Sequence, residues 1–177
     1  MAGVAADGSE LARQQLEDLR GQQRAISGVL RAVARSVGLQ PVLDEVVDAC
    51  TQLCAADNGA LWLLEGALLL SVAHHGEAET AEYDRQHPHA LDRTTAAGRT
   101  AVAGETGPHP GRPGDPEYAY PGPNPNRAML GVPVMVEDDL IGVVVLVRRD
   151  AQPFTDEHIA LVQTSPTRRR SRSRTRA

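Results

Sequence analysis

The chain begins with a segment in which apolar or neutral residues recur at alternating intervals of four and three. They fall at Ala12, Leu16, Leu19, Gln23, Ile26, Leu30, Val33 and Val37. This spacing predicts a long amphipathic, coiled-coil-like helix over residues 10–38, ended by Gly38 and preceded by a disordered start, residues 1–9. Two interpretations stay open: a signalling helix that pairs with its twin in a dimer, or a helix that lies on its own domain.

A second helix is predicted from Val42 to Ala56, because Pro41 suits a first helical turn and apolar residues gather on one face. Strand patterns follow at residues 60–64 (ALWLL) and 68–73, with Glu65-Gly66 between them. This pair is predicted to form a β-hairpin.

The middle of the chain is polar, with helices predicted over residues 78–86 and 96–103, and residues 107–126 are crowded with Gly and Pro. Two further strands are predicted at residues 129–136 and 140–147. Pro133 is expected at a bulge or an edge, because it lacks a backbone donor. Both strands are apolar almost throughout, which is typical of a sheet covered on both faces. A covering of loops and short helices on one face is a natural place for a ligand pocket.

Composition and charge limit the classes of function that the chain can have. All 18 basic residues are arginine, which indicates a high-GC bacterial genome. Six of them, and no acid, lie in residues 165–177, so the remaining chain is more acidic than the net charge of −5 suggests. This acidic part of the chain, residues 1–164, has no electrostatic reason to bind nucleic acid or an anionic membrane. No signal peptide or membrane-spanning run is seen, and two cysteines in a helical pattern fit a reducing compartment, so a cytoplasmic location is expected.

Three groups of residues could have a metal-binding, redox or ligand-binding role. For each of them we favour a structural interpretation. Cys50 and Cys54 could be a metal or redox pair, but no further ligands lie nearby in sequence, so core packing is preferred. His74 and His75 could face a ligand or sense pH, but ordinary strand-end histidines are preferred. The acidic run at residues 137–139 is expected to be a soluble turn. No catalytic residue and no metal site is predicted, and the cofactor is left open.

Seven segments occur in an order that resembles a GAF domain. They are the helix at 41–56, ALWLL, SVAHHG (71–76), AAGRTAVAGET (96–106), DPEYAYP (115–121), MLGVPVMVEDDLIGVVVLVRR (129–149) and PFTDEHIALVQT (153–164). The resemblance covers residues 39–164. It is closest to the GAF modules of bacterial multi-sensor histidine kinases and related signalling regulators.

The resemblance implies an α/β (α+β) fold of GAF/PAS-like type, with a six-stranded antiparallel sheet, helices on one face and a small-molecule pocket on the other. We expect Trp62, His74, Leu130 and Val132 at that pocket. The implied role is sensing and relay without catalysis, in a homodimer formed through its helices, with an output domain outside this chain. The chain has no counterpart of the signatures for cyclic nucleotides or bilins, so the ligand stays unknown. The alternative is a structural dimerisation module without a ligand.

Two segments depart from the family pattern. Relatives continue after residue 164 with a helix of the type FADQAAIAIANAR, and removing one base from a plausible coding string for it gives SPTRRRSRSRTR. Adding one base before a coding string for a VHIPDVLA-type strand and losing one at its end gives GPHPGRPG, residues 107–114, after which the frame is restored. We therefore expect residues 165–177 to be a frameshifted, disordered tail of a truncated fragment. The strand at 107–114 is expected to be missing or irregular.

Overall fold

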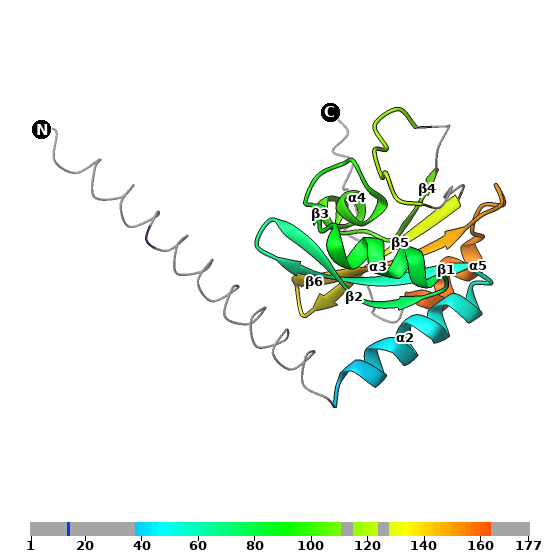
Figure 1. Cartoon of the computed structure of the whole chain (residues 1–177), viewed down its shortest axis with the longest axis horizontal. Coiled ribbons are helices and arrows are strands. Elements are labelled where there is room, and N and C mark those ends of the chain that lie inside the picture. The colour runs from blue at the N-terminus through cyan, green and yellow to red at the C-terminus, as the bar shows by residue number, and fades with distance from the viewer. Residues whose placement is uncertain (1–13, 15–37, 111–114, 124–127, 164–177) are drawn as a thin grey trace, which may run out of the picture.

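The computed structural model describes residue 14 and residues 38–110, 115–123 and 128–163 (Figure 1). The strands are β1 Asn58–Glu65, β2 Leu68–His75, β3 His89–Ala90, β4 Gly107–Pro110, β5 Ala128–Val136 and β6 Asp139–Arg148, and the helices are α2 Gln40–Leu53, α3 Ala78–Gln86, α4 Ala96–Ala103 and α5 Asp156–Val162. The strands form one antiparallel sheet in the order β3-β2-β1-β6-β5-β4. The predicted mixed α/β fold is confirmed. The start at 1–9 and the tail at 165–177 lie outside the described residues, as does the predicted helix at 10–38 except for positions 14 and 38.

Strands β5 and β6 pack a core on each face of the sheet. In β5, Leu130 and Val132 belong to one core, whereas Met129 belongs to the other. In β6, Val144 and Leu146 share the first core, and the odd-numbered valines from Val143 to Val147 share the second. Successive side chains of a strand point to opposite faces. This is why both strands are apolar throughout, as predicted for a sheet covered on both sides.

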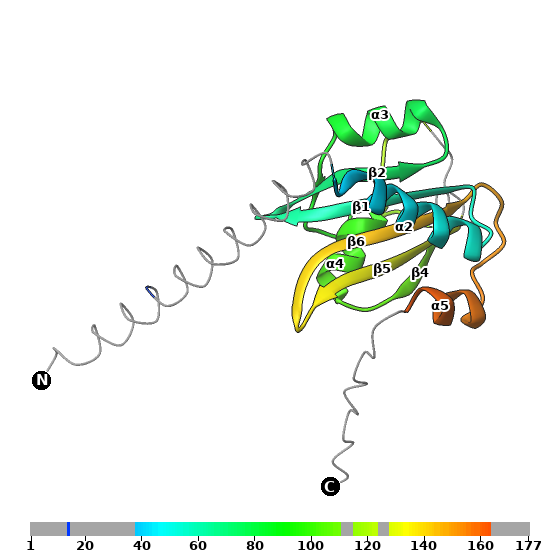
Figure 2. The ribbon, with the colours of Figure 1, turned by 90° about the horizontal axis from the view of Figure 1, so that it is seen from below.

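The first core is closed by α2 and α5, which lie on the same side of the sheet (Figures 1 and 2). Pro41 sits in the first turn of α2, where its missing donor costs nothing. Thr155 caps α5 by accepting a hydrogen bond from the backbone of His158. Helices that begin and end the domain therefore share one face, and the opposite face is left to α4 and the segments around it.

The strand at residues 107–114, expected to be missing or irregular, is present as the short strand β4, Gly107–Pro110. Gly107–Pro110 pairs antiparallel with β5 at the edge of the sheet. Pro108 and Pro110 are two residues apart, so both missing backbone donors fall on one side of the strand. At an edge strand that side can face away from the neighbour, and two prolines are then compatible with pairing.

Pro133 lies where its missing donor is tolerated. The pairing of β4 ends at Gly131, so β5 is a local edge at Pro133. A register shift between Val134 and Met135 follows directly. The predicted position at an edge or bulge is confirmed.

Gly131 provides a test of how closely α4 packs on the sheet. A Cβ at Gly131 would lie 1.8 Å from Thr100 Oγ1, whereas one at Gly107, directly opposite in β4, would meet nothing within 4 Å. Gly131→Ala should therefore lower the free energy of unfolding by about 1–3 kcal/mol, as overpacking does. Urea unfolding of this variant beside Gly107→Ala measures the effect. Equal stability of the two variants would show that α4 is not held against β5.

Candidate functional site

A cavity lies on the α4 side of the sheet, between β1, β2, β5 and β6 and the segments that carry α3, α4 and Tyr120. It offers about 40 Å³ to the centres of water-sized molecules. One water needs on the order of 10–15 Å³ on this measure, so the space suits a group of roughly three non-hydrogen atoms. A larger ligand would require the walls to move apart. The cavity is therefore matched to a small molecule or to one part of a larger one.

A β-bulge in β2 turns His74 toward this cavity. Leu61 pairs with Ala73 and Trp62 with Ser71, so Val72 is the extra residue. The bulge reverses the alternation along the strand: Ala73 joins the core under α2, while His74 lines the cavity. Bulges commonly redirect a side chain in this way beside functional sites.

His74 meets Asp84 and Tyr120 at one end of the cavity. The Tyr120 hydroxyl donates a hydrogen bond of 2.8 Å to Asp84 Oδ1. The other carboxylate oxygen, Oδ2, lies 3.7 Å from His74 Nε2, which is too far for a hydrogen bond. The side chains of His74 and Asp84 are both 6% exposed. One oxygen of this buried carboxylate thus accepts a hydrogen bond from Tyr120. The other lies beside His74 without a hydrogen bond to it.

Burial sets the protonation states of this cluster. Burial raises the pKa of Asp84 to about 6, although the hydrogen bond from Tyr120 acts to lower this pKa. It lowers the pKa of His74 to about 4, and the nearby charges of Arg85 and His75 act in the same direction. The pKa of Tyr120 is raised well above its ordinary range, first by burial and then by Asp84. At pH 7–8 the cluster therefore holds a carboxylate, a neutral imidazole and a phenol that donates.

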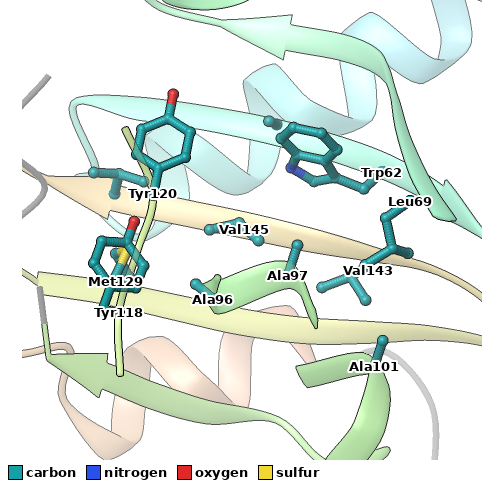
Figure 3. Close-up of a cluster of buried hydrophobic side chains, with 12 residues drawn as sticks. Trp62, Leu69, Ala96, Ala97, Ala101, Tyr118, Tyr120, Met129, Val143 and Val145 are labelled. Carbon is teal, nitrogen blue, oxygen red and sulfur yellow. The ribbon is translucent and has the colours of Figure 1, made fainter. Parts of the chain in front are cut away.

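Aromatic rings form a wall of the cavity. Trp62 stacks on His89 with ring centroids 3.9 Å apart, and Tyr120 meets His89 edge to face at 5.6 Å. Figure 3 shows Trp62 and Tyr120 with the valines of β6 and with Ala96 and Ala97 of α4. Burial lowers the pKa of His89 to about 4, so this ring is neutral at pH 7. The wall offers flat apolar surface beside a carboxylate.

The segment that carries Tyr118 and Tyr120 is anchored by Arg99 of α4. The Arg99 guanidinium pairs with Asp115, donates to the backbone carbonyl of Arg93 and lies 5.9 Å from the centre of the Tyr118 ring. The Tyr118 hydroxyl donates to Met129 Sδ on β5. These contacts hold both tyrosines over the sheet.

Two residues that line the cavity each have a buried polar atom with no hydrogen-bond partner among the described residues. These atoms are Asn58 Nδ2 and His89 Nδ1. Asn58 is 3% exposed, so its amide hydrogens are also shielded from bulk water. A buried polar group without a partner costs about 1–3 kcal/mol. The cavity wall is therefore suited to a molecule that supplies the missing partners.

Of the four expected pocket residues, Trp62 and His74 line the cavity. Leu130 and Val132 do not, because they lie on the opposite face of the sheet in the core under α2 and α5. Their neighbour Met129 takes the position facing the cavity. Asn58, Asp84, His89 and Tyr120 were missed. Tyr120 belongs to DPEYAYP, which carried the family resemblance, but no pattern linked it to Asp84 at 36 positions' distance.

The remaining candidate residues lie away from the cavity. Cys54 is buried under α2 and its thiol contacts the backbone carbonyl of His158, while Cys50 is half-buried; both are free thiols. Burial raises the pKa of both. Glu137 and Asp138 form the turn between β5 and β6, and Asp139 begins β6. Within the described part of the chain, no group of three or more metal-binding side chains comes together, and no helix is long and apolar enough to cross a membrane.

The described residues thus form an α/β domain with an antiparallel sheet, terminal helices on one face and a cavity on the other. The sequence profile of the GAF domain family matches residues 38–165, so this chain belongs to the GAF domain family. No curated protein matches the sequence.

Solved structures agree with this fold. The GAF domain of a phosphoenolpyruvate-protein phosphotransferase from Coxiella burnetii superposes with a TM-score of 0.61 at 18% identity, covering 75% of this chain and 80% of that one. The GAF-B domain of DevS from Mycobacterium smegmatis gives 0.55 at 22%, covering 68% and 82%. A type II free methionine-R-sulfoxide reductase from Thermoplasma acidophilum gives 0.56 at 18%, covering 70% and 86%. These likenesses show the fold.

Proposed function

We propose that this GAF domain is a sensory module that binds a small molecule in the cavity and relays its presence to a neighbouring output domain. The observation that carries the proposal is that two residues of the cavity wall, Asn58 and His89, have buried polar atoms, Nδ2 and Nδ1, without a partner among the described residues. A wall built only for packing would be expected to satisfy or omit such groups. A bound molecule would pair them.

The contacts of β2 support a route for the relay. His74 lines the cavity, and the next residue, His75, contacts Asp48 of α2 with Nδ1 and Oδ1 2.6 Å apart. The bulged residue Val72 accepts a hydrogen bond of 2.8 Å from Gln40 at the start of α2. A ligand that shifts the end of β2 would therefore move α2. The sequence predicts a long helix directly before α2, of the kind that joins sensor modules to histidine kinases, and we propose this context for the domain.

The position of the cysteines favours binding over a thiol-based reductase activity. The chain has two cysteines, and both lie on α2 or at its end, across the sheet from the cavity. The thiolate is the reactive form, and burial raises the pKa of both thiols, which disfavours it. In our proposal this chain therefore shares a fold with the Thermoplasma reductase but has no thiol-based reductase activity.

A second candidate function is assembly without a ligand. Val42, Val46 and Leu53 are 49%, 44% and 53% exposed on α2, at spacings of four and seven that share a helix face. An apolar stripe of this kind favours packing against a partner helix, and a homodimer is the simplest arrangement.

A thermal-shift screen with small metabolites separates the two candidates. A ligand present at about 100 times its Kd should stabilise the domain by roughly 3 kcal/mol, which raises the midpoint by several degrees. Sedimentation in the presence and absence of each hit reports assembly. If no compound raises the midpoint while the protein is a stable dimer, the sensory proposal fails and the structural one stands.

A further inference from the structure

This inference rests on the proposed sensory function. The buried carboxylate of Asp84 in the cavity wall limits the class of ligand that can bind there. Asp84 is a buried carboxylate whose Oδ1 accepts a hydrogen bond from Tyr120 and whose Oδ2 lies 3.7 Å from His74 Nε2. A charged group is costly to bury unless it is paired. Among the described residues, Asp84 therefore has no cation within hydrogen-bond distance.

The described residues do not supply this cation. The chain has no lysine, and each described arginine is held elsewhere. The partners are Glu82 for Arg85, Glu117 for Arg93, Asp115 for Arg99, Glu77 for Arg149, and backbone carbonyls including that of Cys54 for Arg148. Two histidines lie near Asp84. Burial lowers the pKa of His74 to about 4, and His87, whose charge acts to lower the pKa of Asp84, is exposed and contacts the backbone carbonyl of Tyr83. The counter-charge has to come from outside the described protein.

The surroundings of Asp84 suit a flat or compact organic cation. Tyr120 donates to Asp84 and lies edge to face with both His89 and Tyr83, with ring centroids 5.6 and 5.9 Å apart, and Trp62 stacks on His89. Aromatic faces attract cations, and a carboxylate pairs well with the fork of N–H groups in an amidinium or guanidinium. We infer that the cavity binds a ligand that presents a protonated nitrogen group, an amine, amidine or guanidine, to the free oxygen of Asp84.

The test uses two probes of the same shape that differ in charge, acetamidinium chloride and acetamide. Each has four non-hydrogen atoms, so binding needs only a small outward movement of the cavity walls, and the single tryptophan of the chain, Trp62, reports on binding through its emission. At pH 8 acetamidinium should bind in the millimolar range, at least about tenfold tighter than acetamide, since a hydrogen-bonded charge pair is worth about that much. Sodium chloride at equal concentration controls for ionic strength.

Asp84→Asn should remove the preference while keeping the site. Asparagine still accepts from Tyr120, so the variant is expected to fold, which its thermal unfolding verifies. Its affinity for acetamidinium should fall at least about tenfold and approach that for acetamide. Glu82→Gln, the same chemical change at an exposed position of the same helix, should leave both affinities unchanged.

Three results would overturn the inference: equal binding of the two probes, a preference that survives Asp84→Asn, or no binding of acetamidinium. These outcomes differ from failure of the sensory proposal. If a neutral or anionic compound raises the unfolding midpoint in the screen and changes the Trp62 emission, the sensory proposal stands. Only the inference of a cationic ligand then fails.

Discussion

Asp84→Asn should increase the free energy of unfolding at pH 8 by on the order of 3 kcal/mol. Burial raises the pKa of Asp84 from 3.8 to about 6, so the folded protein bears the cost of an ionised carboxylate that the unfolded chain does not. Asparagine is neutral and retains an oxygen that accepts from the Tyr120 hydroxyl. The substitution therefore removes the cost of the charge and keeps the hydrogen bond.

The pH dependence of this gain identifies its origin. The folded state of the wild-type protein binds the Asp84 proton more tightly than the unfolded state, so this group lowers stability as pH rises from about 4 to 6. The advantage of Asp84→Asn should be complete above about pH 7 and absent near pH 4. His74 and His89, with pKa values lowered to about 4, destabilise both proteins as pH falls below 6.5 and largely cancel in the comparison.

Urea unfolding at pH 8, 6 and 4 measures this difference. Glu82→Gln is the matched control, because its exposed ion pair with Arg85 contributes about 0–1 kcal/mol. A gain that is the same at all three pH values would mean that the pKa of Asp84 does not differ between the folded and unfolded states. A loss of stability at pH 8 would mean that a cation within the protein pairs with it.

Leu130→Ala should lower the free energy of unfolding by about 2–5 kcal/mol without changing ligand affinity. Leu130 is fully buried in the core that faces α2 and α5, so its truncation leaves a hole on the side away from the cavity. Met129→Ala should cost a similar amount and also alter binding, because Met129 lines the cavity and accepts from Tyr118.

Chemical unfolding and titration of a screen hit measure the two effects separately. Val132→Ala is a milder variant on the same face as Leu130 and keeps the test available if Leu130→Ala does not fold. Both should bind the hit with wild-type affinity. Weakened binding by Val132→Ala with unchanged binding by Met129→Ala would place the site on the other face of the sheet.

Element type and order were predictable because local patterns specify them. The helices at 78–86 and 96–103 match α3 and α4, and the two hairpins are present with ends shifted by one or two residues. The strand β4 was not predicted, since two prolines argue against pairing unless the strand is known to lie at an edge. Edge position is a property of the whole sheet and is not encoded in the four residues themselves.

The site was less predictable for two physical reasons. In β5 the run MLGVPVMV has no polar residue to mark a face, so Leu130 and Met129 could not be told apart. In β2 the bulge at Val72 reverses the alternation, so the cavity-facing histidine could not be identified from parity. Asp84 sits on a polar helix, where burial of one carboxylate depends on Tyr120 arriving from a distant segment.

The central claim is that a small molecule binds on the α4 side of the sheet, and Trp62 provides a direct test. Its side chain lines the cavity, is 2% exposed, and is the one tryptophan of the chain. A compound that raises the unfolding midpoint should change the Trp62 emission with a saturable dependence on concentration and with the same Kd as the thermal shift gives. A compound that stabilises the protein while leaving this emission unchanged would contradict the account.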